Sequence, residues 1–164
     1  MIRWSLQDIA NSPLPNLVSF RVTYDPQIEN AHVLAILAPS LKKRSLRSLD
    51  FSSCSAMDLH SLEWLVTHGN NLEELAIGDN SAVTDEMLIE VTNFKRLRYL
   101  DLSKCGISRF GLMNVVNGSS GALREVNISE CRRIDSDAVQ LVKKSGLKIT
   151  HWPVVGELRR LLGT

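Results

Sequence analysis

The sequence predicts an α/β solenoid, in which about six strands stack as a parallel sheet on the concave face and helices line the convex face. The first observation is a short pattern with apolar residues at positions one, four and six and Cys or Asn at position nine. Its copies begin at Leu46, Leu72, Leu97 and Leu123, in steps of 26, 25 and 26 residues. The second observation is that the apolar period changes within each unit from two, typical of strands, to 3.6, typical of helices. Such units bury their apolar faces against their neighbours.

The beginning and end of the chain give weaker copies of the pattern. Residues 1–16 are predicted to form an N-terminal half-unit helix, and 17–25 the first repeat strand. The helix that follows is expected to end at Pro39, because proline lacks the N–H that would continue it. Repeats are predicted over 17–152 and a C-terminal capping helix over 153–164, which makes 1–164 one domain. The half-unit start leaves three alternatives open: a fragment, an end docked on a partner, or a capping helix.

Each strand-to-helix junction places a short polar residue after an apolar one. Such a side chain accepts a hydrogen bond from the free N–H groups of the first helical turn, worth about 1 kcal/mol. The four predicted caps are Asp58, Thr84, Ser108 and Asp135. The helices after them are expected to turn apolar residues toward the sheet, Leu59, Phe110 and Leu141 among them.

The pattern L-x-x-L-x-L-x-x-N/C is the consensus of a leucine-rich repeat. The segments V-T-D-E-M-L, I-S-R-F-G-L and I-D-S-D-A-V, together with Cys54, Cys105 and Cys131 at the strand ends, resemble the cysteine-containing class of these repeats. That class occurs in F-box/leucine-rich-repeat proteins and in the antagonist of mitotic exit network family. The resemblance implies a right-handed horseshoe solenoid and intracellular protein binding, most often as the substrate-recognition part of an SCF-type ubiquitin ligase receptor.

The resemblance does not extend to an F-box, which is not visible in the sequence. Skp1 and cullin are therefore expected as partners only if an F-box lies outside this chain. The alternative function is a structural subunit or assembly factor of a larger complex, which includes mitochondrial complexes. We expect an intracellular protein, cytoplasmic or nuclear, with a mitochondrial location left open.

The charge is close to balanced but unevenly distributed. A formal net charge of +1 argues against a dedicated nucleic-acid binder, and no run of about 18 apolar residues predicts a membrane span. Residues 51–94 contain eight acids and no Lys or Arg, whereas 95–164 contain 13 basic and six acidic residues. We interpret 42–44 and 95–96 as cations that complement helix C-termini, in preference to a nucleic-acid site.

No grouping of residues predicts catalysis. The four histidines, His32, His60, His68 and His151, have no metal-ligand spacing, and no nucleophile motif or glycine-rich phosphate loop is present. Adjacent units place Cys105 and Cys131 about 5 Å apart, but at a position that faces the stack and satisfies loop backbone groups. We therefore expect no enzyme activity, cofactor or metal, and a structural role for the cysteines.

The candidate site is the concave face of the sheet, where the residues between the core leucines point. The side chains of this face are polar and small, and they are acidic toward its centre. Tyr99 is its only aromatic residue. Because Tyr is enriched at binding hot spots, Tyr99 is the predicted anchor for a protein partner. The acidic residues around it favour a partner that is basic. The loops around Lys104, Arg132 and Arg133 are the second choice of site. The predicted partner-binding residues are Ser48, Asp50, Glu74, Tyr99, Asp101, Ser103, Glu125 and Asn127.

Overall fold

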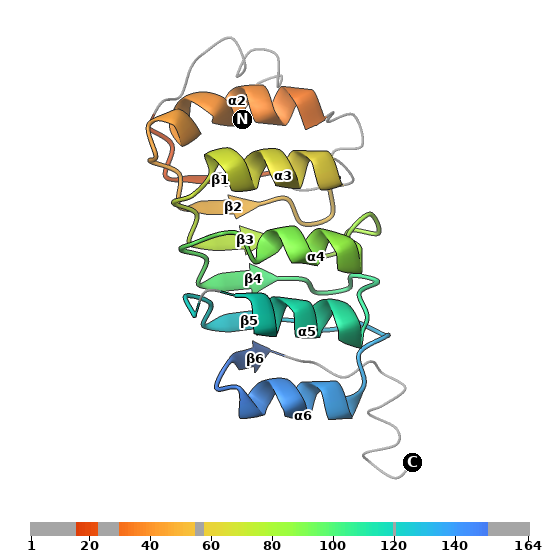
Figure 1. Cartoon of the computed structure of the whole chain (residues 1–164). Helices are drawn as coiled ribbons and strands as arrows, with labels where there is room; N and C mark the ends of the chain where they lie inside the picture. The colour runs from red at the N-terminus through yellow and green to blue at the C-terminus, as the bar shows by residue number, and fades with distance from the viewer. Residues whose placement is uncertain (1–15, 23–29, 55–57, 120, 151–164) are drawn as a thin grey trace, which may run out of the picture.

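The protein is a stack of strand–helix units in which every strand is parallel to its neighbours (Figure 1). The computed structural model describes residues 16–22, 30–54, 58–119 and 121–150. The strands are β1 (Ser19–Arg21), β2 (Ser48–Asp50), β3 (Glu74–Ala76), β4 (Tyr99–Asp101), β5 (Glu125–Asn127) and β6 (Lys148–Thr150). The helices are α2 (Asn30–Lys42), α3 (Leu59–His68), α4 (Asp85–Val91), α5 (Arg109–Gly118) and α6 (Ser136–Lys144). The sheet order β1-β2-β3-β4-β5-β6 confirms the predicted fold class.

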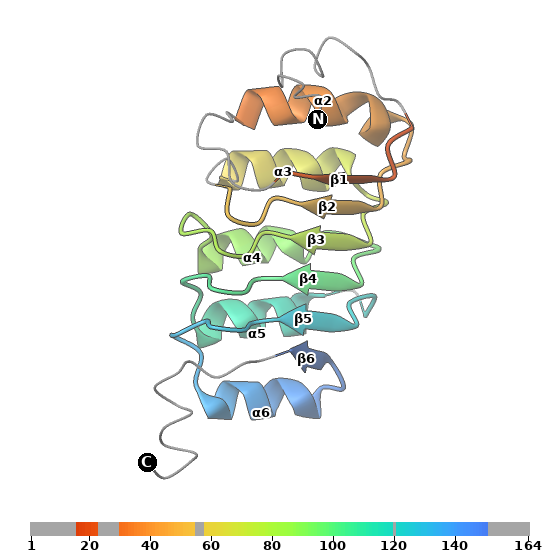
Figure 2. The ribbon, with the colours of Figure 1, turned by 180° about the vertical axis from the view of Figure 1, so that it is seen from behind.

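The stack curves because its two layers have different natural spacings. Parallel strands lie about 4.8 Å apart, whereas packed helices need about 8–10 Å. The row of helices is accordingly longer than the row of strands that it covers (Figure 1). Seen from behind, the sheet faces the viewer with no described helix over it (Figure 2). The sheet therefore forms the concave face, as predicted.

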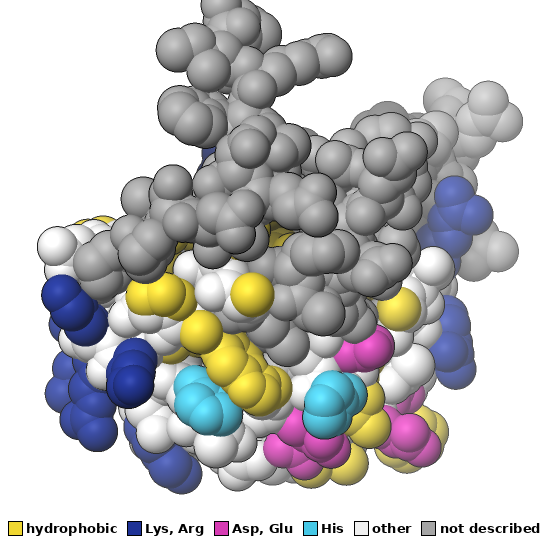
Figure 3. Space-filling view, turned by 90° about the horizontal axis from the view of Figure 1, so that it is seen from above, with side chains coloured by type: hydrophobic (Ala, Val, Ile, Leu, Met, Phe, Trp, Pro, Cys, Tyr) yellow, Lys and Arg dark blue, Asp and Glu magenta, His cyan; other side chains and the backbone are white. Residues whose placement is uncertain are grey.

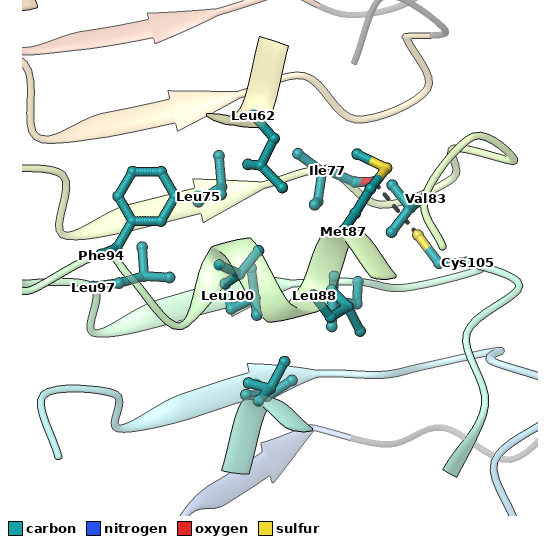
Figure 4. Close-up of a cluster of buried hydrophobic side chains, with 14 of the residues drawn as sticks. Leu62, Leu75, Ile77, Val83, Met87, Leu88, Phe94, Leu97, Leu100 and Cys105 are labelled. Atoms are coloured by element: carbon teal, nitrogen blue, oxygen red, sulfur yellow. Dashed lines mark hydrogen bonds between the residues drawn. The ribbon is translucent and has the colours of Figure 1, made fainter. Parts of the chain in front are cut away.

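The core is a ladder of leucines between the sheet and the helices. The central residue of each of the strands β2 to β5 is at most 1% exposed and lies directly beside its equivalent in the next strand. Leu88 from α4 and Leu75 and Leu100 from the sheet belong to one cluster of buried side chains (Figure 4). Burial of one such side chain contributes about 1.5–3 kcal/mol. The repeated leucines thus form one continuous core.

The predicted helix caps are all present. Asp58 accepts a hydrogen bond from the Ser61 N–H at 2.8 Å, and Asp135 one from the Ala138 N–H at 2.7 Å. Thr84 and Ser108 cap α4 and α5 in the same way. The four helices α3 to α6 thus begin by the same local chemistry.

The residue at the ninth position of the pattern links neighbouring units. The thiol of Cys105 donates to the carbonyl of Ile77 at 3.4 Å, and that of Cys131 to the carbonyl of Leu102 at 3.0 Å. Asn80 donates in the same direction, to the carbonyl of Cys54 at 2.8 Å. Burial raises the pKa of Cys105 to about 11 and that of Cys131 to about 12, so both thiols stay protonated donors. The predicted structural role of the cysteines is confirmed.

The loops after the strands continue the ladder. The N–H of Lys104 bonds to the carbonyl of Ser129 at 2.8 Å, and that of Ser53 to the carbonyl of Gly78 at 2.8 Å. Four equivalent loop residues have left-handed backbone conformations, with φ between 51° and 61°. For side chains other than Gly this costs about 1–2 kcal/mol each, and the hydrogen bonds between units offset that cost. These residues are Ser53, Asp79, Lys104 and Glu130.

Two kinds of expectation about the helices are wrong. Pro39 lies inside α2, which continues to Lys42. The carbonyl that loses its partner is that of the exposed Ala35, which water can reach, while Leu37 and Leu41 hold the opposite side in the core.

The second error concerns side chains expected to face the sheet. Phe110 is 75% exposed, Leu141 47% and Leu59 38%. At 100° per residue, Phe110 is roughly 150° around the helix from the centre of the buried stripe of α5. Residues 1–15 and 151–164, with the expected terminal helices, lie outside the described residues.

Gly111 gives a test of how tightly neighbouring units pack. A Cβ there would clash with Asp85 Oδ1, and the N–H of Ser108 donates to the same carboxylate at 2.8 Å. We expect Gly111→Ala to lower the free energy of unfolding by about 1–3 kcal/mol, although Ala normally favours a helix. Urea denaturation measures this.

Two controls decide whether the clash is the cause. Gly106→Ala should be near neutral, because a Cβ there meets nothing within 4 Å. In Asp85→Ala/Gly111→Ala the loss should be smaller than the sum of the single effects. Additive single effects would contradict the proposed contact between Gly111 and Asp85.

Candidate functional site

The concave face contains two rows of side chains set by the strand register. The first residues of the strands form one row and the third residues another, on the face opposite the buried leucines. The first row, from β2 to β6, is Ser48, Glu74, Tyr99, Glu125 and Lys148, and the second is Asp50, Ala76, Asp101, Asn127 and Thr150. All eight residues predicted as a site lie in these rows or, for Ser103, directly after the second, and none is buried.

The acidic residues near the two ends of the face are paired. Arg21 Nε lies 2.7 Å from Asp50 Oδ2. At the other end, Lys148 Nζ lies 2.8 Å from Glu125 Oε2, and the hydroxyl of Thr150 donates to Glu125 Oε1 at 3.0 Å. The acids of the face that are not in an ion pair among the described residues, Glu74 and Asp101, therefore lie at its centre.

Tyr99 lies at that centre, with its ring half-buried. Burial, and then the neighbouring charge of Asp101, raise the pKa of its hydroxyl, which therefore stays protonated at neutral pH. Asn127 forms a hydrogen bond with the hydroxyl. Glu74 is exposed beside Tyr99 and has no ion-pair partner among the described residues. Tyr99 therefore lies beside Glu74 in the register of the sheet and close to the charge of Asp101.

Several polar residues of the face also have a structural role. Asp50, Asp101 and Asn127 each accept a hydrogen bond from the backbone N–H two residues later, at 3.0, 2.8 and 3.1 Å. Their substitution would disturb the loops as well as the surface. Glu74 and Tyr99 make no such turn, so they are the better probes of binding.

The third unit has the smallest side chains on the concave face, next to Tyr99. Ala76 and Gly78 replace the larger polar residues of the other strands. A Cβ at Gly78 would lie 2.6 Å from Ser103 Oγ and 3.1 Å from Asp101 Oδ1. The absence of a side chain at Gly78 therefore leaves room for the side chain of Ser103.

The second-choice site lies at the edge where the strands end. A cavity of about 480 Å³ there has walls of mixed charge, with Cys105 and Gly106 at its base. Arg133 donates to the carbonyl of Gly106 at 2.9 Å and so helps to build the wall. The charged residues that line it are Asp79, Lys104, Glu130, Arg132 and Arg133. Three cations against two acids give this cavity little net charge.

Among the described residues, no group of three or more His, Cys, Asp and Glu residues could hold a metal ion. None of the described helices is long and apolar enough to cross a membrane.

Comparison with known proteins supports the fold. No protein-family model matches the chain, and no curated protein matches it. The chain is similar to a solved structure described as Leiomodin-1 Actin-Binding Site 2 (ABS2), with a TM-score of 0.51 and 13% sequence identity. The match covers 96% of this chain and 83% of that chain. At this identity the similarity establishes the shared α/β repeat fold alone.

The pair Lys148–Glu125 predicts a pH dependence of stability. The hydrogen bond from Lys148 holds the pKa of Glu125 below its usual value of 4.5. The charged carboxylate therefore stabilises the fold above pH 4.5, and this contribution is lost as the pH falls through the lowered folded-state pKa. Glu125→Gln should lower the free energy of unfolding at pH 7 by less than about 1 kcal/mol.

Thermal unfolding of the variant and the wild type across pH measures this effect. The difference between them should shrink as the solution is acidified, and also with added salt. Glu74→Gln, at the equivalent position of β3 but without a cation partner among the described residues, is the matched control at pH 7. A difference that persists unchanged at acid pH would contradict the assignment.

Proposed function

We propose that the protein is a non-catalytic protein-interaction module whose concave face binds a partner. The supporting observation is the half-buried Tyr99, which neighbours Glu74 in the sheet register and Asp101 in charge, on a face that no described helix covers. A rigid aromatic ring loses little conformational entropy on binding. Its ring can pack against a partner while its protonated hydroxyl donates a hydrogen bond. The similar fold of a structure described as an actin-binding site is compatible with this use of the solenoid.

The charges around Tyr99 indicate the chemistry of the partner. Because Asp50 and Glu125 are paired within the chain, Glu74 and Asp101 are the acids left to attract it. A Lys or Arg side chain of a partner would reach both, with its aliphatic part over the ring of Tyr99. Charges placed in this way favour a basic segment and repel an acidic one.

Substitution of Tyr99 tests this site. Tyr99→Ala should reduce capture of partner proteins from a native extract by tenfold or more, which corresponds to at least about 1.4 kcal/mol. The measurement is quantitative mass spectrometry of proteins retained by the immobilised chain, with the thermal midpoint of each variant recorded. Tyr99→Phe should retain part of the binding, since the ring is kept.

Phe110→Ala is the control, because it also removes an aromatic ring, but one that is 75% exposed on the helix side of the same stack. Its retained proteins should be those of the wild type. If Tyr99→Ala kept the full set with an unchanged thermal midpoint, the concave face would not be the site. The cavity beside Lys104, Arg132 and Arg133 would then be the next surface to examine.

The finer proposal is that this module selects substrates for an SCF-type ubiquitin ligase, with any F-box outside this chain. It is supported by the resemblance of the repeat units to those of F-box/leucine-rich-repeat proteins. Immunoprecipitation of the gene product expressed from its own locus should then recover Skp1 and a cullin. Recovery of a stable assembly that contains neither would favour the alternative, a structural subunit or assembly factor.

A further inference from the structure

A strong positive charge lies along the edge of the solenoid at which the strands begin. We call it the basic edge, defined by the segments 42–48, 69–74, 92–99, 121–125 and 143–148. These segments contain eleven Lys and Arg residues but only three acids, Glu73, Glu74 and Glu125. Seen from above, several Lys and Arg side chains gather on this side, at the left of the view (Figure 3). The cations are Lys42, Lys43, Arg44, Arg47, Lys95, Arg96, Arg98, Arg124, Lys143, Lys144 and Lys148.

The opposite edge, where the strands end, lacks this excess. Its described segments, 51–54, 58, 77–85, 102–109 and 128–136, contain four basic and five acidic residues. The near-neutral charge of the whole chain therefore hides a pronounced separation of charge between its two edges. The sequence alone suggested only that some of these cations complement helix dipoles.

The interaction with helix dipoles accounts for some of the cations of the basic edge. The last turn of α2 contains Lys42, and that of α6 contains Lys143 and Lys144. The last turns of α4 and α5 contain no basic residue. Because the dipole effect falls off within the last turn, it does not explain the cations in the loops after α4 and α5.

Ion pairs within the chain do not neutralise all the cations of the basic edge. Consecutive backbone hydrogen bonds join Arg47, Glu73, Arg98 and Arg124 into one row across the sheet. Glu73 lies 3.7 Å from Arg47 and 4.0 Å from Arg98, which is the limit of an ion pair, while Lys148 pairs with Glu125. Among the described residues Arg124 has no carboxylate partner, and its side chain is exposed.

Arg98 and Arg124 are direct neighbours in this row. The N–H of Arg124 bonds to the carbonyl of Arg98 at 2.9 Å. Like charges at adjacent strand positions destabilise a sheet by a few tenths of a kcal/mol. The concave rows avoid this arrangement, since none of their acids has an acid beside it in the next strand. The fold therefore gains nothing from the pair of arginines.

We propose that the basic edge, centred on Arg98 and Arg124, is a second interaction surface that binds an acidic, extended segment of a protein partner. Arg presents a planar fork that holds carboxylates in two-pronged contact. The strip is narrow, because the acidic centre of the concave face borders it, and a single extended chain suits that width. Of the two aromatic residues in these segments, Phe94 is buried and Tyr99 is the first residue of β4 on the concave face, so the described loops of the edge have no exposed ring for base stacking. A protein segment is thus favoured over nucleic acid.

A labelled acidic peptide tests the surface directly. The probe is a fluorescein-labelled peptide of alternating Glu and Gly, about 12 residues long, which spans ~40 Å when extended. Fluorescence anisotropy should show binding to the full chain that weakens strongly as salt is raised. Arg124→Glu, and separately Lys95→Glu/Arg96→Glu, should each weaken it about tenfold.

Three controls make the result specific. Arg132→Glu changes the net charge by the same amount on the opposite edge and should leave the affinity within about twofold. Tyr99→Ala should also leave it unchanged, so that failure of this proposal is distinct from failure of the concave site. Arg124→Glu should keep or raise the thermal midpoint, because it places an acid beside Arg98.

Three outcomes would overturn the proposal. They are no binding of the peptide by the wild type, an equal loss in Arg132→Glu, or tighter binding of a single-stranded oligonucleotide of equal charge. The last would assign the basic edge to nucleic acid.

Discussion

The difference between the spacing of strands and that of helices determines most of this structure. Each unit adds one strand, about 4.8 Å from the last, and one helix, which needs about twice that distance. The stack must curve toward the sheet, so equivalent side chains crowd on the concave face and spread on the convex one. Crowding makes the order of charges along a row energetically important. In the first row acids alternate with Ser48 and Tyr99, and the final Glu125 is next to Lys148.

The fold was predictable from the sequence because its determinants are local and repeated. A strand ends where Cys105, Cys131 or Asn80 donates to the preceding unit, and a helix begins at a cap three or four residues later. Those signals need no knowledge of distant contacts. The wrong predictions came from rules that hold only on average. Proline usually ends a helix, but α2 continues through Pro39 because the carbonyl left unbonded is on its exposed side.

The candidate site was predictable in position but not in charge. Alternation along each strand places Asp50, Tyr99 and Glu125 on the concave face. It does not reveal that Arg21 neutralises Asp50 or that Lys148 neutralises Glu125, because those contacts depend on side-chain conformations at the ends of the sheet. The basic edge was missed for a related reason. Its cations come from four separate segments of the chain, and only the register of the strands brings them together.

The basic edge and the acidic concave centre meet at consecutive residues, Arg98 and Tyr99. A uniform polyanion that follows the edge is repelled by Glu74 and Asp101 if it turns onto the concave face, and a basic segment that turns from the concave face onto the edge is repelled by Arg98 and Arg124. Each surface therefore excludes the ligand of the other, although the two lie within a few residues. Because the sheet spacing fixes how close the two signs of charge must lie, a ligand that contacts both surfaces needs acidic and basic groups in a matching order. The curvature of the stack thus limits the partners as well as the shape.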